Sequence, residues 1–173
     1  MWTLSGFADE IDDDLERQCS LLDQLGIRFI EFRSAWGVNV LDLDDEQVAR
    51  ARDILWAHGI QASSIGSPIG KVNITDDFDA HLARMDRAVW GAQQLRAPFI
   101  RVFSFFLTPD QRPEDHRDEV VRRMAALAQR AEAGGVVMLH ENEKGIFGDV
   151  PERVFDIVTA VNSPALRLAW DAA

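Results

Sequence analysis

Five times along this chain, a helical stretch ends at a glycine or proline and passes at once into a short apolar run. The five junctions read LGIRFIEF, HGIQASSI, RAPFIRVF, GGVVMLHE and NSPALRLAW. Strict alternation of helices and strands predicts a parallel sheet whose strands are joined by right-handed crossovers. The strands are almost continuously apolar, which is typical of strands that helices cover on both faces.

The limits of the helices and strands follow from these junctions and from the spacing of apolar residues. We expect helices at 14–25, 44–58, 78–95, 113–133 and 151–161. We expect strands at 3–7, 27–32, 60–65, 99–105, 136–139 and 166–171. The chain has 173 residues, of which 47% are hydrophobic, and it contains no linker or low-complexity segment. We therefore predict one domain that covers 1–173.

Two folds satisfy this alternation, an open doubly wound sheet and a (β/α)8 barrel. No loop carries a Gly-x-Gly-x-x-Gly or Walker-type phosphate signature. In a barrel, side chains at the C-terminal strand ends meet at one mouth. The polar residues at or near those ends are Glu31, Arg33, Arg101, Glu141 and Asp171. We predict an α/β fold of the (β/α)8 TIM-barrel type that is incomplete, because only about six strands and five helices are present.

Charge and cysteine content restrict the class of protein. The net charge is −11, and no basic run stands out, so general nucleic-acid binding is disfavoured. A single cysteine, Cys19, excludes an internal disulfide framework and suits a reducing cytosol. No secretory signal begins the chain, and no run is long enough to span a bilayer. We expect a cytoplasmic protein without a membrane or nucleic-acid partner.

The segment 136–149, VVMLHENEKGIFGD, passes directly from apolar to ionisable residues. Side chains alternate along a strand, so Glu141 shares a face with Leu139, and His140 takes the opposite face. We expect Glu141 to point into the barrel mouth and His140 to face the helix layer as a supporting residue. Asp171 ends the neighbouring strand. Two carboxylates brought close together suit a hard divalent cation such as Mg²⁺ or Mn²⁺, which relieves their repulsion.

Four further residues are candidates for substrate binding. Lys71 follows a glycine-containing loop, where it reaches a substrate phosphate or carboxylate or else is an ordinary surface lysine. Arg33 and Trp36 follow a strand and suit an anion clamp and an apolar wall for a sugar. Trp36 is equally compatible with loop packing. Asn142, beside the candidate catalytic glutamate, suits a contact to a substrate hydroxyl.

The remaining ionisable residues have structural interpretations. We expect Arg101 to lie inside the barrel and to pair with Glu31, as a structural ion pair as readily as a catalytic one. Three histidines, His58, His81 and His116, lie on or near helices and are predicted to be surface residues.

The segments FADEI, IEFRSAWGVNVLDL, IGSPIGKVNITDD, IRVFSFF, HENEKGIFGD and LRLAWDAA occur in this order. Together they resemble the xylose isomerase-like TIM-barrel superfamily, in particular its sugar phosphate isomerase/epimerase branch. The resemblance implies a divalent metal (Mn, Mg, Co or Zn) held by carboxylates that correspond to Glu141 and Asp171. It also implies a His from strand 7 and a Glu from strand 8, which lie beyond Ala173, so the chain departs from the family pattern there.

The chemistry implied by the resemblance is proton transfer next to a carbonyl, through a metal-stabilised enediolate, with Glu141 as metal ligand and acid/base group. We expect an isomerase or epimerase of a small sugar, polyol or sugar phosphate in carbohydrate metabolism. A second hypothesis is a cyclic-polyol dehydratase or an abasic-site endonuclease, the latter disfavoured by the −11 charge. A third is a partial chain without activity of its own, or one completed by homo-oligomerisation.

Overall fold

The computed structural model of the chain describes residues 2–172. It contains two compact units, the first with residues 2–67 and 90–100 and the second with residues 68–89 and 101–172. Helix α3 (Phe78–Leu95) and strand β5 (Phe99–Val102) contribute residues to both units. No helix among residues 2–172 combines the length and the hydropathy needed to cross a membrane.

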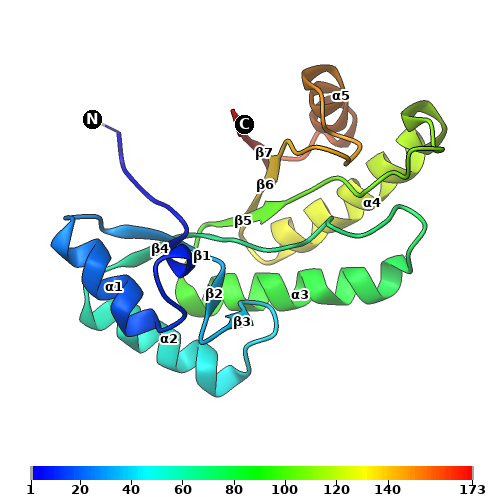
Figure 1. Cartoon of the computed structure of the whole chain (residues 1–173). Coiled ribbons are helices and arrows are strands. Elements are labelled where there is room, and N and C mark those ends of the chain that lie inside the picture. Colours follow the sequence, from blue (N-terminus) through cyan, green and yellow to red (C-terminus); the bar gives the residue numbers. More distant parts are fainter. Residues whose placement is uncertain (1, 173) are drawn as a thin grey trace. The chain divides into compact units, whose positions relative to one another are not determined.

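The first unit is built on parallel strands with helices beside them, coloured blue to cyan in Figure 1. Strand β1 pairs in parallel with β4, and β4 pairs in parallel with the start of β5. A two-stranded antiparallel sheet, β2 with β3, follows β1 directly. The elements are η1 (Ala8–Glu10), α1 (Leu15–Gln24), β1 (Phe29–Phe32), β2 (Ser34–Ala35), β3 (Val38–Asn39), α2 (Asp45–Ala57) and β4 (Gln61–Ile65).

The second unit repeats the same helix-to-strand pattern, and its residues from 113 onward are coloured yellow-green to red in Figure 1. Strands β6 and β7 pair in parallel, from Met138 opposite Leu166 to Glu141 opposite Ala169. The elements that complete this unit are α4 (Pro113–Ala133), β6 (Val137–Glu141), α5 (Pro151–Val161) and β7 (Leu166–Ala169). Buried apolar side chains of α4, including Met124 and Leu127, contribute to the core of the unit.

Local sequence explains where the helices begin. The Asp44 side chain accepts a hydrogen bond from the Gln47 backbone N–H, and the Gln47 side-chain oxygen accepts one from the Asp44 backbone N–H, which forms a capping box before α2. Helices α4 and α5 start at a proline, whose missing N–H costs nothing in the first helical turn. The prediction of an α/β fold with parallel strands is confirmed, and the limits of α3 and α5 agree with those expected from sequence.

Two expectations about strands are wrong. Residues 3–7, all within the described part of the chain, form no strand and are largely exposed. A backbone hydrogen bond from the Glu31 N–H to the Gly6 carbonyl joins them to β1. In contrast, the expected loop after β1 contains the β2–β3 hairpin, whose turn residues Trp36 and Gly37 both have positive φ. This geometry suits a two-residue turn between twisted strands. The expectation of one domain over 1–173 stays a prediction.

Candidate functional site

Three segments of the second unit are joined by backbone hydrogen bonds beyond the strand ends. We call residues 69–74, 103–107 and 145–147 the loop platform. The N–H groups of Phe103, Phe105 and Phe106 donate to the carbonyls of Ile69, Gly70 and Val72, at 2.7, 2.9 and 2.9 Å. On the other side, Leu107 donates to Gly145 at 3.1 Å and Phe147 to Phe105 at 3.0 Å. These backbone bonds continue the hydrogen bonding of the strands into the loops, so the side chains of the loop platform are held in fixed positions.

Gly70 and His81 fix one edge of the platform. Gly70 has φ +89°, and a Cβ atom at this position would lie 2.0 Å from the Phe103 carbonyl oxygen. Its N–H donates to Nε2 of His81 at 2.8 Å. Burial lowers the pKa of His81 to about 4, and the nearby Arg84 and Arg123 act in the same direction. The prediction that His81 is a surface residue is wrong, because α3 turns this side chain inward to satisfy the loop.

Glu141 ends β6 with a partly exposed side chain. Burial alternates along the strand, so that Leu139 and Glu141 are partly exposed and Met138 and His140 are buried. The Glu141 carboxylate lies 3.6 Å from Nη1 of Arg101, which comes from β5. Both side chains are mostly shielded, with 17% and 11% exposed respectively. The predicted pairing of Arg101 with Glu31 stays a prediction.

His140 precedes Glu141 on β6 and is fully buried. Burial lowers the pKa of His140 to about 4, so the ring is neutral at physiological pH. Among the described residues, neither ring nitrogen has a hydrogen-bond partner. The ring packs against Gly148, where a Cβ atom would lie 2.6 Å from its Cε1, and the Gly148 N–H donates to Oγ of Ser104 at 2.8 Å. The imidazole therefore supports the loop after β6, and it lies on the face of the strand opposite to the Glu141 side chain.

Asn142 connects the ends of β6 and β7. Its Nδ2 donates to the Asp171 carbonyl at 2.8 Å, and its Oδ1 accepts the Asp171 N–H at 3.0 Å. The Asn142 side chain, which was predicted to contact a substrate hydroxyl, thus binds the backbone of Asp171, the second candidate metal ligand. Because β6 and β7 pair in register up to Glu141 and Ala169, the two candidate ligands belong to neighbouring strand ends.

Lys71 forms an ion pair that sequence reasoning did not identify. Its Nζ lies 2.6 Å from Oε2 of Glu143 and 4.3 Å from the ring centroid of Phe103. The guanidinium of Arg101 lies 5.1 Å from the same centroid. Glu143 is not among the residues predicted from the sequence to belong to the site, although its position two residues after Glu141 indicates that it lies nearby. Lys71, Glu143, Arg101 and Glu141 thus form two ion pairs beside one buried aromatic ring.

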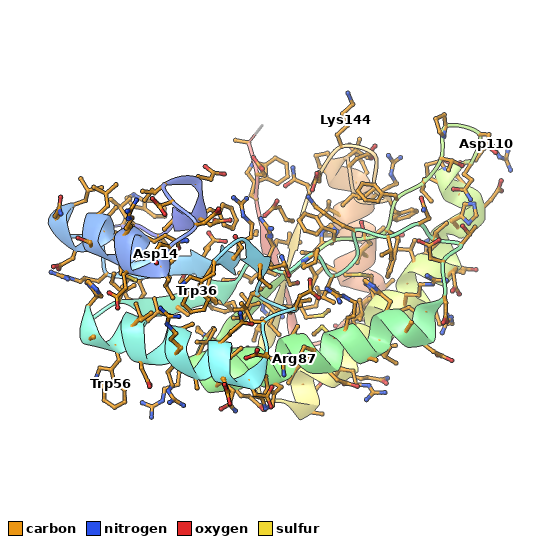
Figure 2. All side chains as sticks on the ribbon, turned by 60° about the horizontal axis from the view of Figure 1, so that its bottom comes forward. Asp14, Trp36, Trp56, Arg87, Asp110 and Lys144 are labelled. Atoms are coloured by element: carbon orange, nitrogen blue, oxygen red, sulfur yellow. The ribbon has the colours of Figure 1, made fainter. Side chains whose placement is uncertain are left out.

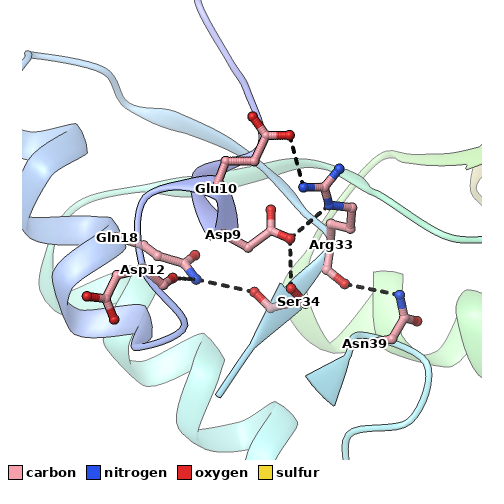
Figure 3. A network of polar contacts seen from close by, with 7 residues as sticks. All are labelled: Asp9, Glu10, Asp12, Gln18, Arg33, Ser34 and Asn39. Atoms are coloured by element: carbon pink, nitrogen blue, oxygen red, sulfur yellow. Dashed lines mark hydrogen bonds and ion pairs between the residues drawn. The ribbon is translucent and has the colours of Figure 1, made fainter. Parts of the chain in front are cut away.

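The first unit holds Arg33 in an internal network (Figure 3). Its Nε lies 2.8 Å from Asp9 and its Nη2 lies 3.1 Å from Glu10, and Ser34 Oγ also donates to Asp9 at 2.7 Å. The hydrogen bond to Asp9 is the main cause that raises the pKa of Arg33. The guanidinium stacks 4.5 Å from the centroid of Phe7. Two carboxylates already bind Arg33, so its predicted role as an anion clamp requires a ligand to compete with them.

Trp36 lies at the turn of the β2–β3 hairpin, where Figure 2 labels it. Its ring faces the Arg50 guanidinium at 4.7 Å, and its Nε1 is buried with no hydrogen-bond partner among residues 2–172. These contacts belong to the first unit and are those of a packed loop residue. Its predicted role as a wall for a sugar stays a prediction, as does any site role of Glu31.

The family profile described as xylose isomerase-like TIM barrel matches residues 19–173. The chain belongs to this family. Its fold is thus confirmed as a partial barrel of the TIM type, with parallel strands alternating with helices. No curated protein matches the chain significantly.

Solved structures of the family share the fold at low sequence identity. A D-tagatose 3-epimerase-like protein superposes with a TM-score of 0.79 at 15% identity, over 96% of this chain and 64% of its own. A xylose isomerase-like TIM barrel protein from Mycobacterium smegmatis, in complex with magnesium, gives 0.75 at 18%, over 99% and 64%. The IOLI protein with a bound zinc atom gives 0.75 at 16%, over 95% and 61%. The chain thus spans less than two thirds of each of these structures.

The proteins that share this fold differ in the activities and metals that their names give. Matched structures also include proteins described as a probable 3-DHS dehydratase from Bacillus anthracis and an AP endonuclease of family 2 from Brucella melitensis. Within residues 2–172, no group of three or more His, Cys, Asp or Glu side chains is arranged to hold a metal ion. The two carboxylates of the candidate site have the hard oxygen donors that Mg²⁺ and Mn²⁺ prefer. As a donor set they fit part of a divalent metal site.

Proposed function

We propose that this chain carries one half of the active site of a divalent metal-dependent isomerase or epimerase of a small sugar, polyol or sugar phosphate. The observation that carries the proposal is the arrangement at the end of β6. Glu141 is partly exposed there and faces Arg101 at 3.6 Å, while Asn142 binds the backbone of Asp171 through two hydrogen bonds. A cytoplasmic location and a role in carbohydrate metabolism belong to the same proposal.

In this proposal Glu141 accepts a proton from the substrate carbon next to a carbonyl group. Proton transfer by a positioned carboxylate contributes rate enhancements of about 10²–10⁴-fold. Arg101 opposes the negative charge of the Glu141 carboxylate and restricts its orientation. Asn142 fixes the end of β7, so that Asp171 keeps its place beside β6.

Glu141 and Asp171 would hold the cation, which is Mn, Mg, Co or Zn in this proposal. Related structures that contain magnesium or zinc support this assignment. When bound, a divalent cation polarises neighbouring carbonyl and hydroxyl oxygens of a substrate. His140 supports the loop that follows the strand, because its ring packs against Gly148.

The experiment is proton exchange in deuterated water, followed by NMR on a panel of ketoses and aldoses with added Mn²⁺ or Mg²⁺. We expect deuterium to enter the carbon next to the carbonyl, and a Glu141→Gln variant to lose at least about 100-fold in rate. Glu152→Gln is the matched control, because Glu152 is an exposed residue at the start of α5. Equal rates for Glu141→Gln and Glu152→Gln would remove Glu141 from the chemistry.

One observation favours a second candidate, a chain that has no activity of its own. Only two carboxylates of the proposed metal site lie within the described residues, and the chain spans 64% of the length of the magnesium-containing relative. Such a chain would bind a cation weakly or complete its site as a homo-oligomer. Analytical ultracentrifugation during a Mn²⁺ titration distinguishes the two candidates. Tight stoichiometric binding of Mn²⁺ to a monomer would contradict the candidate without activity of its own.

The other reactions represented in the family are tested in the same way. A dehydratase would produce an absorbing unsaturated product from a cyclic polyol, and an abasic-site endonuclease would nick DNA. The net charge of −11 disfavours the DNA substrate, because an acidic surface repels phosphate backbones.

A further inference from the structure

We propose that Lys71 and Glu143 form an anion-exchange site, in which the oxyanion group of a sugar acid or sugar phosphate displaces Glu143 from Lys71. The inference rests on the proposed function, because it adds an anionic group to the substrate whose carbon reacts at Glu141. It assigns Glu143 the role of an internal counter-ion that occupies the site until the ligand arrives.

The position of the Lys71 ammonium does not depend on Glu143 alone. Nζ lies 4.3 Å from the ring centroid of Phe103, and that ring is fully buried. The negative face of an aromatic ring attracts a cation, and the attraction is stronger where water is excluded. Lys71 therefore stays against the ring when Glu143 leaves it.

The backbone below Lys71 is fixed in place. The Lys71 N–H donates to the Pro68 carbonyl at 2.9 Å, and the preceding residue, Gly70, is held by the loop platform and by His81. A cation that is held in position before binding loses little conformational freedom when the ligand arrives. Lys71 has the properties of a preformed half of an anion site.

Glu143 is the movable partner. It lies in the irregular segment between the end of β6 and the platform residue Gly145, outside any helix or strand. The Lys71 and Glu143 side chains are 33% and 35% exposed, so solvent and ligands reach the pair. Ion pairs with this much exposure contribute little to stability, because water screens them, so an incoming oxyanion exchanges with Glu143 at small cost.

The spacing connects this site to the proposed chemistry. Glu143 is two residues from Glu141, a separation of at most about 7 Å along the backbone. Arg101, which pairs with Glu141, lies against the same Phe103 ring as Lys71. A short sugar can therefore place its anionic group at Lys71 while a carbon reaches Glu141. Neutral sugars lack the group that displaces Glu143, so we expect the site to prefer anionic substrates.

Calorimetric titration of the whole chain with inorganic phosphate tests this proposal, in the presence of a chelator so that no metal contributes. We expect Lys71→Met to weaken phosphate binding by at least about tenfold, because a charge-assisted contact is lost. We expect Glu143→Gln to tighten it by about fivefold, because the competing carboxylate is gone. Acetate in place of phosphate distinguishes a preference for carboxylates from one for phosphates.

Two controls match the charge changes. Lys144→Met removes a neighbouring lysine, which extends away from the ribbon in Figure 2, and Glu152→Gln neutralises an exposed glutamate. Phosphate affinity that is absent in the wild type, equal in Lys71→Met and Lys144→Met, or unimproved in Glu143→Gln overturns the anion site. Because phosphate binding is measured without metal, its outcome is separate from deuterium exchange at Glu141. Failure of the anion site and failure of the proposed function are therefore distinguishable.

Discussion

Replacing Gly70 with alanine should destabilise the second unit more than replacing other glycines with positive φ. Gly70 has φ +89°, and its added Cβ would lie 2.0 Å from the Phe103 carbonyl oxygen. Backbone atoms cannot move aside as a flexible side chain can, so residues 69–70 must separate from residues 103–105. The variant thus opens one edge of the loop platform.

The magnitude follows from the bonds that are lost. Left-handed backbone costs an L-residue about 1–2 kcal/mol. Opening the edge breaks three hydrogen bonds, from Phe103 to Ile69, from Phe105 to Gly70, and from Gly70 to His81. At about 1 kcal/mol net for each bond, the free energy of unfolding falls by about 4–5 kcal/mol in total.

Urea unfolding followed by circular dichroism measures this difference. Gly135→Ala is the matched control, because Gly135 has φ +69° but no atom within 4 Å of an added Cβ. The control therefore bears only the backbone cost of about 1–2 kcal/mol. With a denaturant slope of about 2 kcal/mol per molar urea, the midpoints should differ by about 1.5 M. Equal midpoints, or a lower one for Gly135→Ala, would show that the platform does not depend on this close approach.

Two further predictions concern the same unit. Between pH 6.5 and 4, stability should fall as the pH falls, and His81 should contribute up to about 3 kcal/mol to the fall, because it stays neutral in the folded protein down to a pKa of about 4 while the unfolded chain binds a proton. His81→Gln should remove this contribution from urea midpoints taken across that range and leave the one from His140, whose pKa burial also lowers to about 4. An unchanged slope would contradict the assignment. Asn142→Ala should speed hydrogen exchange of the Asp171 amide by about tenfold, since that amide loses its acceptor. Amides inside β7 serve as the internal reference, and equal acceleration there would indicate general loosening instead.

Helix limits were well predicted, because their signals are local. Proline at the first turn of α5, and the glycine or asparagine positions that follow helices, act on the backbone of their own residues. The alternation that separates Glu141 from His140 is equally local, since successive side chains of any strand take opposite faces. These features were accessible without knowledge of the fold.

Strand pairing and burial were predicted less well. Residues 3–7 have an apolar pattern but form no strand, because the backbone bond from the Glu31 N–H to the Gly6 carbonyl joins them to β1 at one point instead of along a ladder. His81 resembles a surface residue on a helix, yet it is 5% exposed, because its Nε2 accepts a hydrogen bond from the buried Gly70 N–H. In both cases, the deciding partner lies elsewhere in the chain.

The sequence by itself determined the α/β alternation, the family, and the candidate carboxylates Glu141 and Asp171, because each depends on periodicity or on a contiguous motif. Only the tertiary structure decided which charges meet. It paired Lys71 with Glu143, Arg101 with Glu141, and Arg33 with Asp9 and Glu10. Ion pairs form between side chains that folding brings within a few ångströms, and no local pattern records that distance.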